Sequence, residues 1–287
     1  MSTTELDLTR RDFVRTAVGS GFAAAVLPVG AQTVKTDSTG LTVGEVTIMV
    51  GDFRMPAYRA APIGPSGQSA NLPVVLVVSE IFGVHEHIAD VARRFAKLGY
   101  LAIAPELFVR QGDAQSYGEI GKLIAEVVSK VPDAQVMTDL DACVSWAKAN
   151  GGDTSKLGIT GFCWGGRITW MYTAHNPDVK AGVAWYGQLF GQPNAPRPTN
   201  PVDVAGRLAG PVLGLYGGDD TGIPVSAVEQ MKTALAGGNA AARASQFVVY
   251  PGAPHAFHAD YRPSYKKDAA EDGWQRCVAW FSANSVR

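Results

Sequence analysis

Apolar runs alternate with segments of helical periodicity from residue 41 to the end of the chain. The run "PVVLVVS" at residues 73–79 is continuously apolar and rich in β-branched residues, as expected of a strand buried on both faces. Similar runs predict strands at 100–107, 156–163, 181–187, 211–218 and 245–252. Because such strands alternate with helices, the pattern predicts a mostly parallel central sheet covered by helices on both faces.

The helical segments show their apolar residues at spacings of three and four. The segment "HIADVARRFAKLG" at 87–99 places Ile88, Val91, Phe95 and Leu98 on one stripe. Two helical segments follow residue 113, and the second carries Val136, Leu140, Cys143, Val144 and Ala147 on one face. Further helices are expected from Trp164 to about His175, at 226–238, and from about Tyr265, where Trp274, Cys277, Val278 and Phe281 recur at helical spacing.

The pattern predicts a β-hairpin in the first part of this region. Residues 41–50 alternate enough to be an exposed strand, and residues 53–62 are its expected partner across Gly51 and Asp52. The chain shows no internal repeat, no low-complexity block and no convincing domain boundary. A single α/β domain over residues 41–287 is therefore the simplest interpretation.

The N-terminus has a different pattern. Paired arginines, Arg10 and Arg11, precede Phe13 and a mildly apolar stretch that ends in small residues. This order resembles a twin-arginine export signal over residues 1–31, with cleavage after Ala31, and predicts a periplasmic or other extracytoplasmic protein that meets the export machinery. The alternative is a short amphipathic helix with incidental arginines. Residues 32–40 are expected to be a disordered lead-in.

Composition narrows the function classes. The 287 residues are 46% hydrophobic and 18% charged, which supplies ample apolar material for one large domain. A formal net charge of −1 gives no indication of nucleic-acid binding. After residue 40, no apolar run approaches the roughly 20 residues that span a bilayer. We expect no cofactor and favour a monomer that acts on a small molecule.

Reactive residues stand at the carboxyl ends of several predicted strands, which is where parallel sheets bind ligands. Cys163 ends the strand at 156–163, Asp219 and Asp220 follow the strand at 211–218, and His255 follows the strand at 245–252. The order nucleophile, acid, histidine matches a nucleophile elbow. Gly161 and Gly165 flank the cysteine, where a tight strand-to-helix turn leaves no room for side chains.

Each of these residues also has a plainer interpretation. Most free cysteines are small buried hydrophobes, and we interpret Cys143 and Cys277 as core residues of this kind. Either aspartate could be a turn residue or a helix cap. His258 is the rival of His255 as the general base. The pairs His255/His258 and His85/His87 could suggest a metal, but no third ligand is evident and we expect no metal site.

Glu80 lies at the end of the buried strand at 73–79, where a carboxylate is costly unless it is paired. Its structural interpretation is a salt bridge, and its functional interpretation is a second carboxylate that faces Cys163. Ile81 and Trp164 follow the ends of neighbouring strands, so their backbone N–H groups are the predicted donors to an oxyanion.

Five segments resemble the dienelactone hydrolase (carboxymethylenebutenolidase) family of the α/β-hydrolase fold, over about residues 45–285: "SEIFGVHEHI", "APELFVRQGD", "GFCWGG", "YGGDDTGIP" and "GAPHAFHADYRPSY". The resemblance implies Cys163 as nucleophile, His255 as base and Asp220 rather than Asp219 as acid. It also implies that Glu80 contacts the cysteine in the resting enzyme. Arg110 matches an arginine that holds the substrate carboxylate. The family's second arginine is replaced by Ala259, and the nearest arginine is Arg262.

The sequence therefore predicts a cysteine-dependent hydrolase of a lactone or ester that forms a thioester on Cys163. The predicted export signal argues for a substrate other than that of the cytoplasmic dienelactone pathway. A broad-specificity esterase or thioesterase is the alternative within the enzyme class. A non-catalytic ligand-binding or thiol-sensing protein on the same fold is the alternative of another class.

Overall fold

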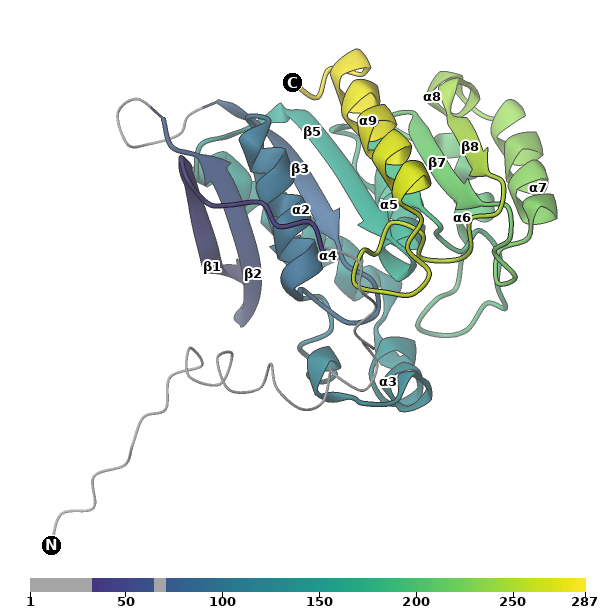
Figure 1. The fold of residues 1–287 in the computed structure, drawn as a ribbon, viewed down its shortest axis with the longest axis horizontal. Helices are drawn as coiled ribbons and strands as arrows, with labels where there is room; N and C mark the ends of the chain where they lie inside the picture. The colour runs from purple at the N-terminus through teal and green to yellow at the C-terminus, as the bar shows by residue number, and fades with distance from the viewer. Residues whose placement is uncertain (1–32, 65–70) are drawn as a thin grey trace, which may run out of the picture.

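The structure is a computed structural model that describes residues 33–64 and 71–287. The predicted twin-arginine signal, residues 1–31, lies outside the described residues. In this part of the chain the fold is one sheet of eight strands in the order β1-β2-β4-β3-β5-β6-β7-β8, with helices packed against it (Figure 1). The strands are β1 (Leu41–Val50), β2 (Phe53–Pro62), β3 (Leu72–Val78), β4 (Leu101–Pro105), β5 (Gly152–Phe162), β6 (Val179–Trp185), β7 (Val212–Gly217) and β8 (Gln246–Tyr250).

The sheet is mostly parallel, as the apolar runs predict. β1 pairs antiparallel with β2, and β2 pairs antiparallel with β4. From β4 to β8 every neighbouring pair is parallel. Because these strands run the same way, the carboxyl ends of β3, β5, β6, β7 and β8 meet at one edge of the sheet. That edge carries the residues that the sequence singled out.

The helices lie on both faces of the sheet, so both faces are buried. They are α2 (Glu86–Lys97), α3 (Ile120–Glu126), α4 (Asp133–Ala149), α5 (Trp164–His175), α6 (Pro201–Val204), α7 (Val225–Ala236), α8 (Ala240–Ala244) and α9 (Lys267–Ala283). Figure 1 shows α2 and α9 in front of the sheet and α4 and α5 behind it. The apolar stripe predicted for α2 is largely buried: Ile88, Val91 and Phe95 have no exposed surface. Leu98, the fourth residue of that stripe, is 49% exposed because the helix has ended at Lys97.

Strand β3 separates two of the hydrophobic cores, one on each face of the sheet. Val74, Leu76 and Val78 pack into one core with α4 and α5, whereas Val75 and Val77 pack into the other with α2 and α9. All five side chains are completely buried. The period of two along a strand therefore explains why a fully buried strand reads as a continuous apolar run.

The segment before β1 differs from the predicted disordered lead-in over residues 32–40. The backbone N–H of Val34 donates to Asp260, and that of Thr36 donates to Asp90 on α2. The backbone carbonyl of Thr36 accepts from Arg93 at 2.9 Å. Hydrophobicity does not reveal this docking, because the segment is held by polar contacts to residues distant in sequence.

No helix within the described part of the chain is long and apolar enough to cross a membrane.

Candidate active site

Cys163 stands at the turn between β5 and α5. Its backbone adopts φ 54° and ψ −112°, a left-handed region that residues other than glycine rarely enter. Two backbone hydrogen bonds fix the turn: the Cys163 N–H donates to the Trp185 carbonyl at 3.0 Å, and its carbonyl accepts from Arg167 N–H at 3.2 Å. Unlike Cys143 and Cys277, which are completely buried, Cys163 is partly exposed.

The glycines around the cysteine are required by close backbone contacts. A Cβ on Gly165 would lie 2.6 Å from the Ser79 carbonyl oxygen and closer still to that of Val78. A Cβ on Gly161 would collide with the Gly165 carbonyl, and one on Gly166 would lie 2.5 Å from the Trp185 carbonyl oxygen. The first turn of α5 is thus pressed against the ends of β3 and β6, and this contact brings Cys163 beside the residues that follow those strands.

The structure brings His255 and Asp220 together. The Nδ1 atom of His255 lies 2.7 Å from Oδ2 of Asp220, whose carboxylate is fully buried. The other oxygen of Asp220 accepts from the backbone N–H groups of Gly222 and Ile223 at 2.9 and 3.1 Å. Both carboxylate oxygens are therefore satisfied, which fixes the carboxylate and leaves Nε2 of His255 for the cysteine. Asp219 instead donates its backbone N–H to Ala253.

The electrostatics link His255 to both partners. Burial lowers the pKa of His255, but hydrogen bonds to Asp220 and to Cys163, together with their charges, raise it to about 10. An imidazole hydrogen-bonded to a thiol is placed to accept the thiol's proton, which makes the sulfur a nucleophile. Cys163, His255 and Asp220 can therefore generate a nucleophile and move a proton.

Glu80, which follows β3, is 1% exposed and is paired. Its carboxylate lies 3.3 Å from Nε2 of His85 and accepts from the Tyr261 hydroxyl at 3.5 Å. Burial raises the pKa of Glu80, but the hydrogen bond and charge of His85, together with smaller effects of His87 and the backbone, hold the pKa below its usual value. The predicted contact between Glu80 and Cys163 stays a prediction, since the contacts above join Glu80 to other residues.

Sequence reasoning missed the aromatic and imidazole neighbours of Glu80. His85 stacks on His87, whose Nδ1 lies 2.9 Å from Oδ1 of Asp260. Tyr261 lies edge-on to His85, with 4.8 Å between ring centroids. Tyr186, fully buried at the end of β6, has its ring centroid 5.1 Å from that of His255. The rule that ligands bind beyond strand ends points to Tyr186, but only the tertiary fold brings Tyr261 to Glu80.

The predicted substrate-binding arginines have different surroundings. Both terminal nitrogens of Arg110 donate to the buried carboxylate of Asp139, at 2.6 and 2.8 Å, and its guanidinium lies over the Phe53 ring at 3.9 Å. Arg262 lies over the Phe82 ring at 5.7 Å. Burial raises the pKa of Tyr186 and Tyr261 well above the usual value, and the charge of Arg262 opposes this rise. Arg262 is therefore a cation close to Tyr186 and Tyr261, which contact His255 and Glu80 respectively.

His258, the rival of His255 as the general base, belongs to the core. His258 is 2% exposed and packs on Phe162 and Trp185, with ring centroids 5.0 and 4.5 Å apart. Burial keeps its pKa well below the usual value, so it is neutral. Within the described residues, no group of three or more His, Cys, Asp or Glu side chains is arranged to hold a metal ion.

Comparisons with known proteins point to one family. The sequence model of the dienelactone hydrolase family matches residues 55–285. A protein of Methylorubrum extorquens, named as a carboxymethylenebutenolidase, is 59% identical over 97% of this chain and 94% of its own length. A relative of the same name from Escherichia coli K12 is 54% identical over 91% of this chain and 94% of its own.

Solved structures give the same result. A crystal structure of a protein from Klebsiella pneumoniae, described as a dienelactone hydrolase, is 56% identical and covers 84% of this chain and 98% of its own, with a TM-score of 0.81. The predicted α/β-hydrolase fold and hydrolase class are confirmed. The chain belongs to the dienelactone hydrolase family.

Proposed function

We propose that this protein is a cysteine-dependent hydrolase of a lactone or ester and that Cys163 is its nucleophile. One observation carries the proposal: a strained, partly exposed cysteine lies beside a histidine whose second nitrogen is held by a buried aspartate. Backbone strain of this kind costs free energy and persists where the surrounding structure requires it, as at active sites. The chain belongs to a family of hydrolases, which supports hydrolysis as the class of reaction.

The proposed reaction has two steps. The Cys163 thiol gives its proton to Nε2 of His255, and the sulfur forms a bond to the acyl carbon of the substrate. As the carbon–oxygen bond breaks, His255 returns the proton to the leaving oxygen, which leaves a thioester on Cys163. His255 then takes a proton from water, the resulting hydroxide attacks the thioester, and the carbon–sulfur bond breaks. His255 returns the proton to the sulfur, so the carboxylic acid is released and the Cys163 thiol is restored. Asp220 keeps the imidazole oriented throughout.

We further propose that the backbone N–H groups of Ile81 and Trp164 stabilise the oxyanion. Trp164 is the first residue of α5, where helix N–H groups have no intrahelical acceptor. Ile81 follows β3, whose last residues are in contact with Gly165 of the same turn. Two such donors would each contribute roughly 3 kcal/mol to transition-state stabilisation.

The test is turnover of an activated ester such as 4-nitrophenyl acetate. Cys163→Ala should lower kcat/KM by at least about 10⁴-fold, as for loss of a nucleophile, while the variant still unfolds in one cooperative transition. Cys143→Ala is the matched control, because Cys143 lies in the core and should leave turnover unchanged. Equal turnover in the Cys163→Ala variant would refute the assignment, and a single burst of nitrophenol without turnover in the unmodified protein would instead favour a thiol sensor.

For an anionic substrate group we propose Arg262 as the binding residue. Arg262→Gln should lower kcat/KM on a carboxylate-bearing ester about tenfold more than on its neutral analogue, because one ion pair is lost. Arg110→Gln leaves the buried Asp139 without its ion-pair partner, so we expect a loss of stability of about 2 kcal/mol. A selective loss on charged esters in the Arg110 variant alone would restore Arg110 as the substrate clamp. No selectivity in either would favour a broad esterase or thioesterase.

Export by the twin-arginine route remains part of the proposal. It rests on Arg10, Arg11 and Phe13 in the sequence, outside the described residues. Fractionation of cells that express the full chain, with N-terminal sequencing of the product, would test it. Replacement of both arginines by lysine should retain the unprocessed protein in the cytoplasm.

A further inference from the structure

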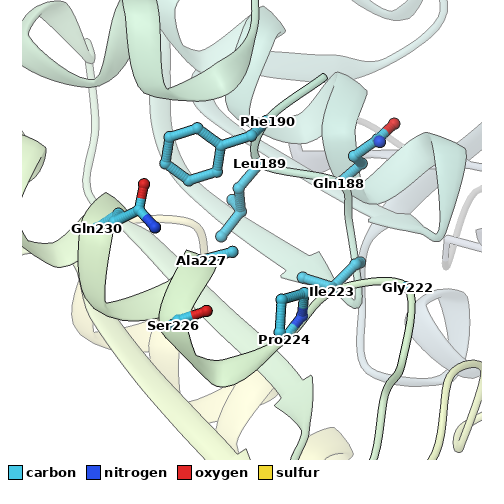
Figure 2. A pocket seen from close by; sticks show the side chains of 9 residues that line it. All are labelled: Gln188, Leu189, Phe190, Gly222, Ile223, Pro224, Ser226, Ala227 and Gln230. Atoms are coloured by element: carbon cyan, nitrogen blue, oxygen red, sulfur yellow. The ribbon is translucent and has the colours of Figure 1, made fainter. Parts of the chain in front are cut away.

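A pocket of about 290 Å³ lies beside the proposed catalytic residues and has no role in the mechanism above. It lies between the chain that follows β6, residues 188–190, and the chain that runs from Gly222 into α7. Figure 2 shows Leu189 and Phe190 on one side of the pocket and Ala227 and Gln230 on the other. Both segments leave the sheet at the edge where Cys163 follows β5.

The pocket is joined to the catalytic residues through both of its walls. One wall begins at Asp220: the backbone N–H groups of Gly222 and Ile223 donate to the carboxylate oxygen that does not face His255. The other wall begins at Tyr186, whose ring contacts His255. Gly187, the next residue, accepts a hydrogen bond from Tyr216 and packs against the backbone of α5. The pocket is therefore held at a fixed position relative to His255.

The lining is neutral. The nine residues are Gln188, Leu189, Phe190, Gly222, Ile223, Pro224, Ser226, Ala227 and Gln230, and none carries a charge. The charged residues Glu80 and Arg262 belong instead to the surroundings of Tyr261. A mainly apolar surface with a few amide and hydroxyl groups suits an uncharged, partly apolar group, such as an aromatic ring with a polar substituent.

We propose that this pocket binds the leaving-group side of an ester substrate, and that this side is neutral and large enough to be bicyclic. The proposal rests on the proposed hydrolase function. His255 must give its proton to the leaving oxygen, so the leaving group starts next to His255, from whose two contacts the pocket walls begin. The volume is about twice that of a roughly 150 Å³ apolar cavity known to bind benzene.

The experiment compares phenyl acetate with 2-naphthyl acetate, whose leaving groups have similar acidity and differ in size. Ala227→Trp fills the pocket and should lower the ratio of kcat/KM for the naphthyl ester over the phenyl ester by about tenfold. Ala236→Trp, on an exposed alanine of the same helix, should leave the ratio within about twofold. Ala227→Leu is the milder variant, and thermal unfolding of each protein shows that it is folded.

A second series varies the acyl chain, from phenyl acetate to phenyl hexanoate. If Ala227→Trp penalises the long acyl chain and spares the naphthyl ester, the pocket holds the acyl side and the leaving-group assignment is wrong. An unchanged ratio in both series would remove the pocket from substrate binding altogether.

Binding of 2-naphthol, followed by its own fluorescence, is the readout that does not depend on turnover. It should weaken in Ala227→Trp and not in Ala236→Trp. If the unmodified protein hydrolysed neither ester but bound 2-naphthol in this way, the proposed function would fail and the pocket would stand. Equal binding by both variants would contradict the pocket as a site for this group.

Discussion

Backbone strain is concentrated around the proposed catalytic residues. Three residues other than glycine that adopt positive φ, Cys163, Tyr186 and Ala256, lie at the same edge of the sheet. Cys163 is the proposed nucleophile, Tyr186 contacts His255, and Ala256 follows His255 directly. Each such conformation costs on the order of 1–3 kcal/mol, which the packing of the glycines and strands around it must offset.

The raised pKa of His255 makes stability depend on pH. Because the pKa is about 10 in the folded protein and 6.5 without these contacts, the stabilisation is fully present below about pH 6.5 and is lost as pH rises toward 10. The unfolding free energy of the unmodified protein should therefore exceed that of His255→Gln most at pH 6 and converge with it near pH 10. Urea unfolding at several pH values measures the difference, and a difference independent of pH would contradict the His255–Asp220–Cys163 coupling.

Sequence patterns predict the proposed catalytic residues, but they do not predict the residues that surround them. Glycines and strand ends mark Cys163 and His255 along the chain, whereas the choice of Asp220 over Asp219 comes from the family resemblance. His85 and Tyr261 were missed as partners of Glu80, and Tyr186 as a neighbour of His255, because these contacts form only when the chain after β3, β6 and β8 comes together in the fold. Arg110 was assigned to a substrate carboxylate, whereas the structure shows it bound to Asp139, a contact between segments that no local pattern reveals.

At the scale of elements, the position of α5 depends on backbone-to-backbone contact. Gly165→Ala would place a methyl group against the Val78 and Ser79 carbonyl oxygens, which cannot move without displacing β3. We expect a loss of about 3 kcal/mol in unfolding free energy, together with a loss of activity.

Gly237→Ala is the matched control for this variant. Gly237 follows α7 with φ −82°, and an added Cβ would lie no closer than 3.6 Å to its nearest neighbour. Alanine should therefore be neutral or slightly stabilising there. Equal stability of the two variants in urea unfolding would show that α5 is not held by the contact with β3.

The strands and the longer helices were predictable because each core-facing pattern is local, whereas the short helices α6 and α8 were not predicted. β3 reads as one apolar run since both of its faces are buried, and α2 shows its apolar stripe in the sequence. The order of strands in the sheet follows from long-range pairing and was not predicted. The docked segment at residues 34–39 was expected to be disordered, because polar contacts to Asp90 and Asp260 leave no hydrophobic signal.

At the scale of the whole molecule, that segment connects the N-terminal part of the chain to the surroundings of Glu80. Val34 binds Asp260, and Asp260 binds His87, which stacks on His85. A chain that starts at residue 40 should be less stable than one that starts at residue 32 by about 2 kcal/mol, since it loses hydrogen bonds to two buried carboxylates. Equal stability of both truncated chains would contradict the docking.

The account as a whole depends on a covalent bond to one sulfur atom. The most direct measurement is mass spectrometry of protein quenched in acid during turnover of 4-nitrophenyl acetate, followed by peptide mapping. We predict an acetyl group on the peptide that contains Cys163, absent from the Cys163→Ala variant. Sustained turnover with an unmodified Cys163, or an acetyl group on another residue that persists in that variant, would contradict the account.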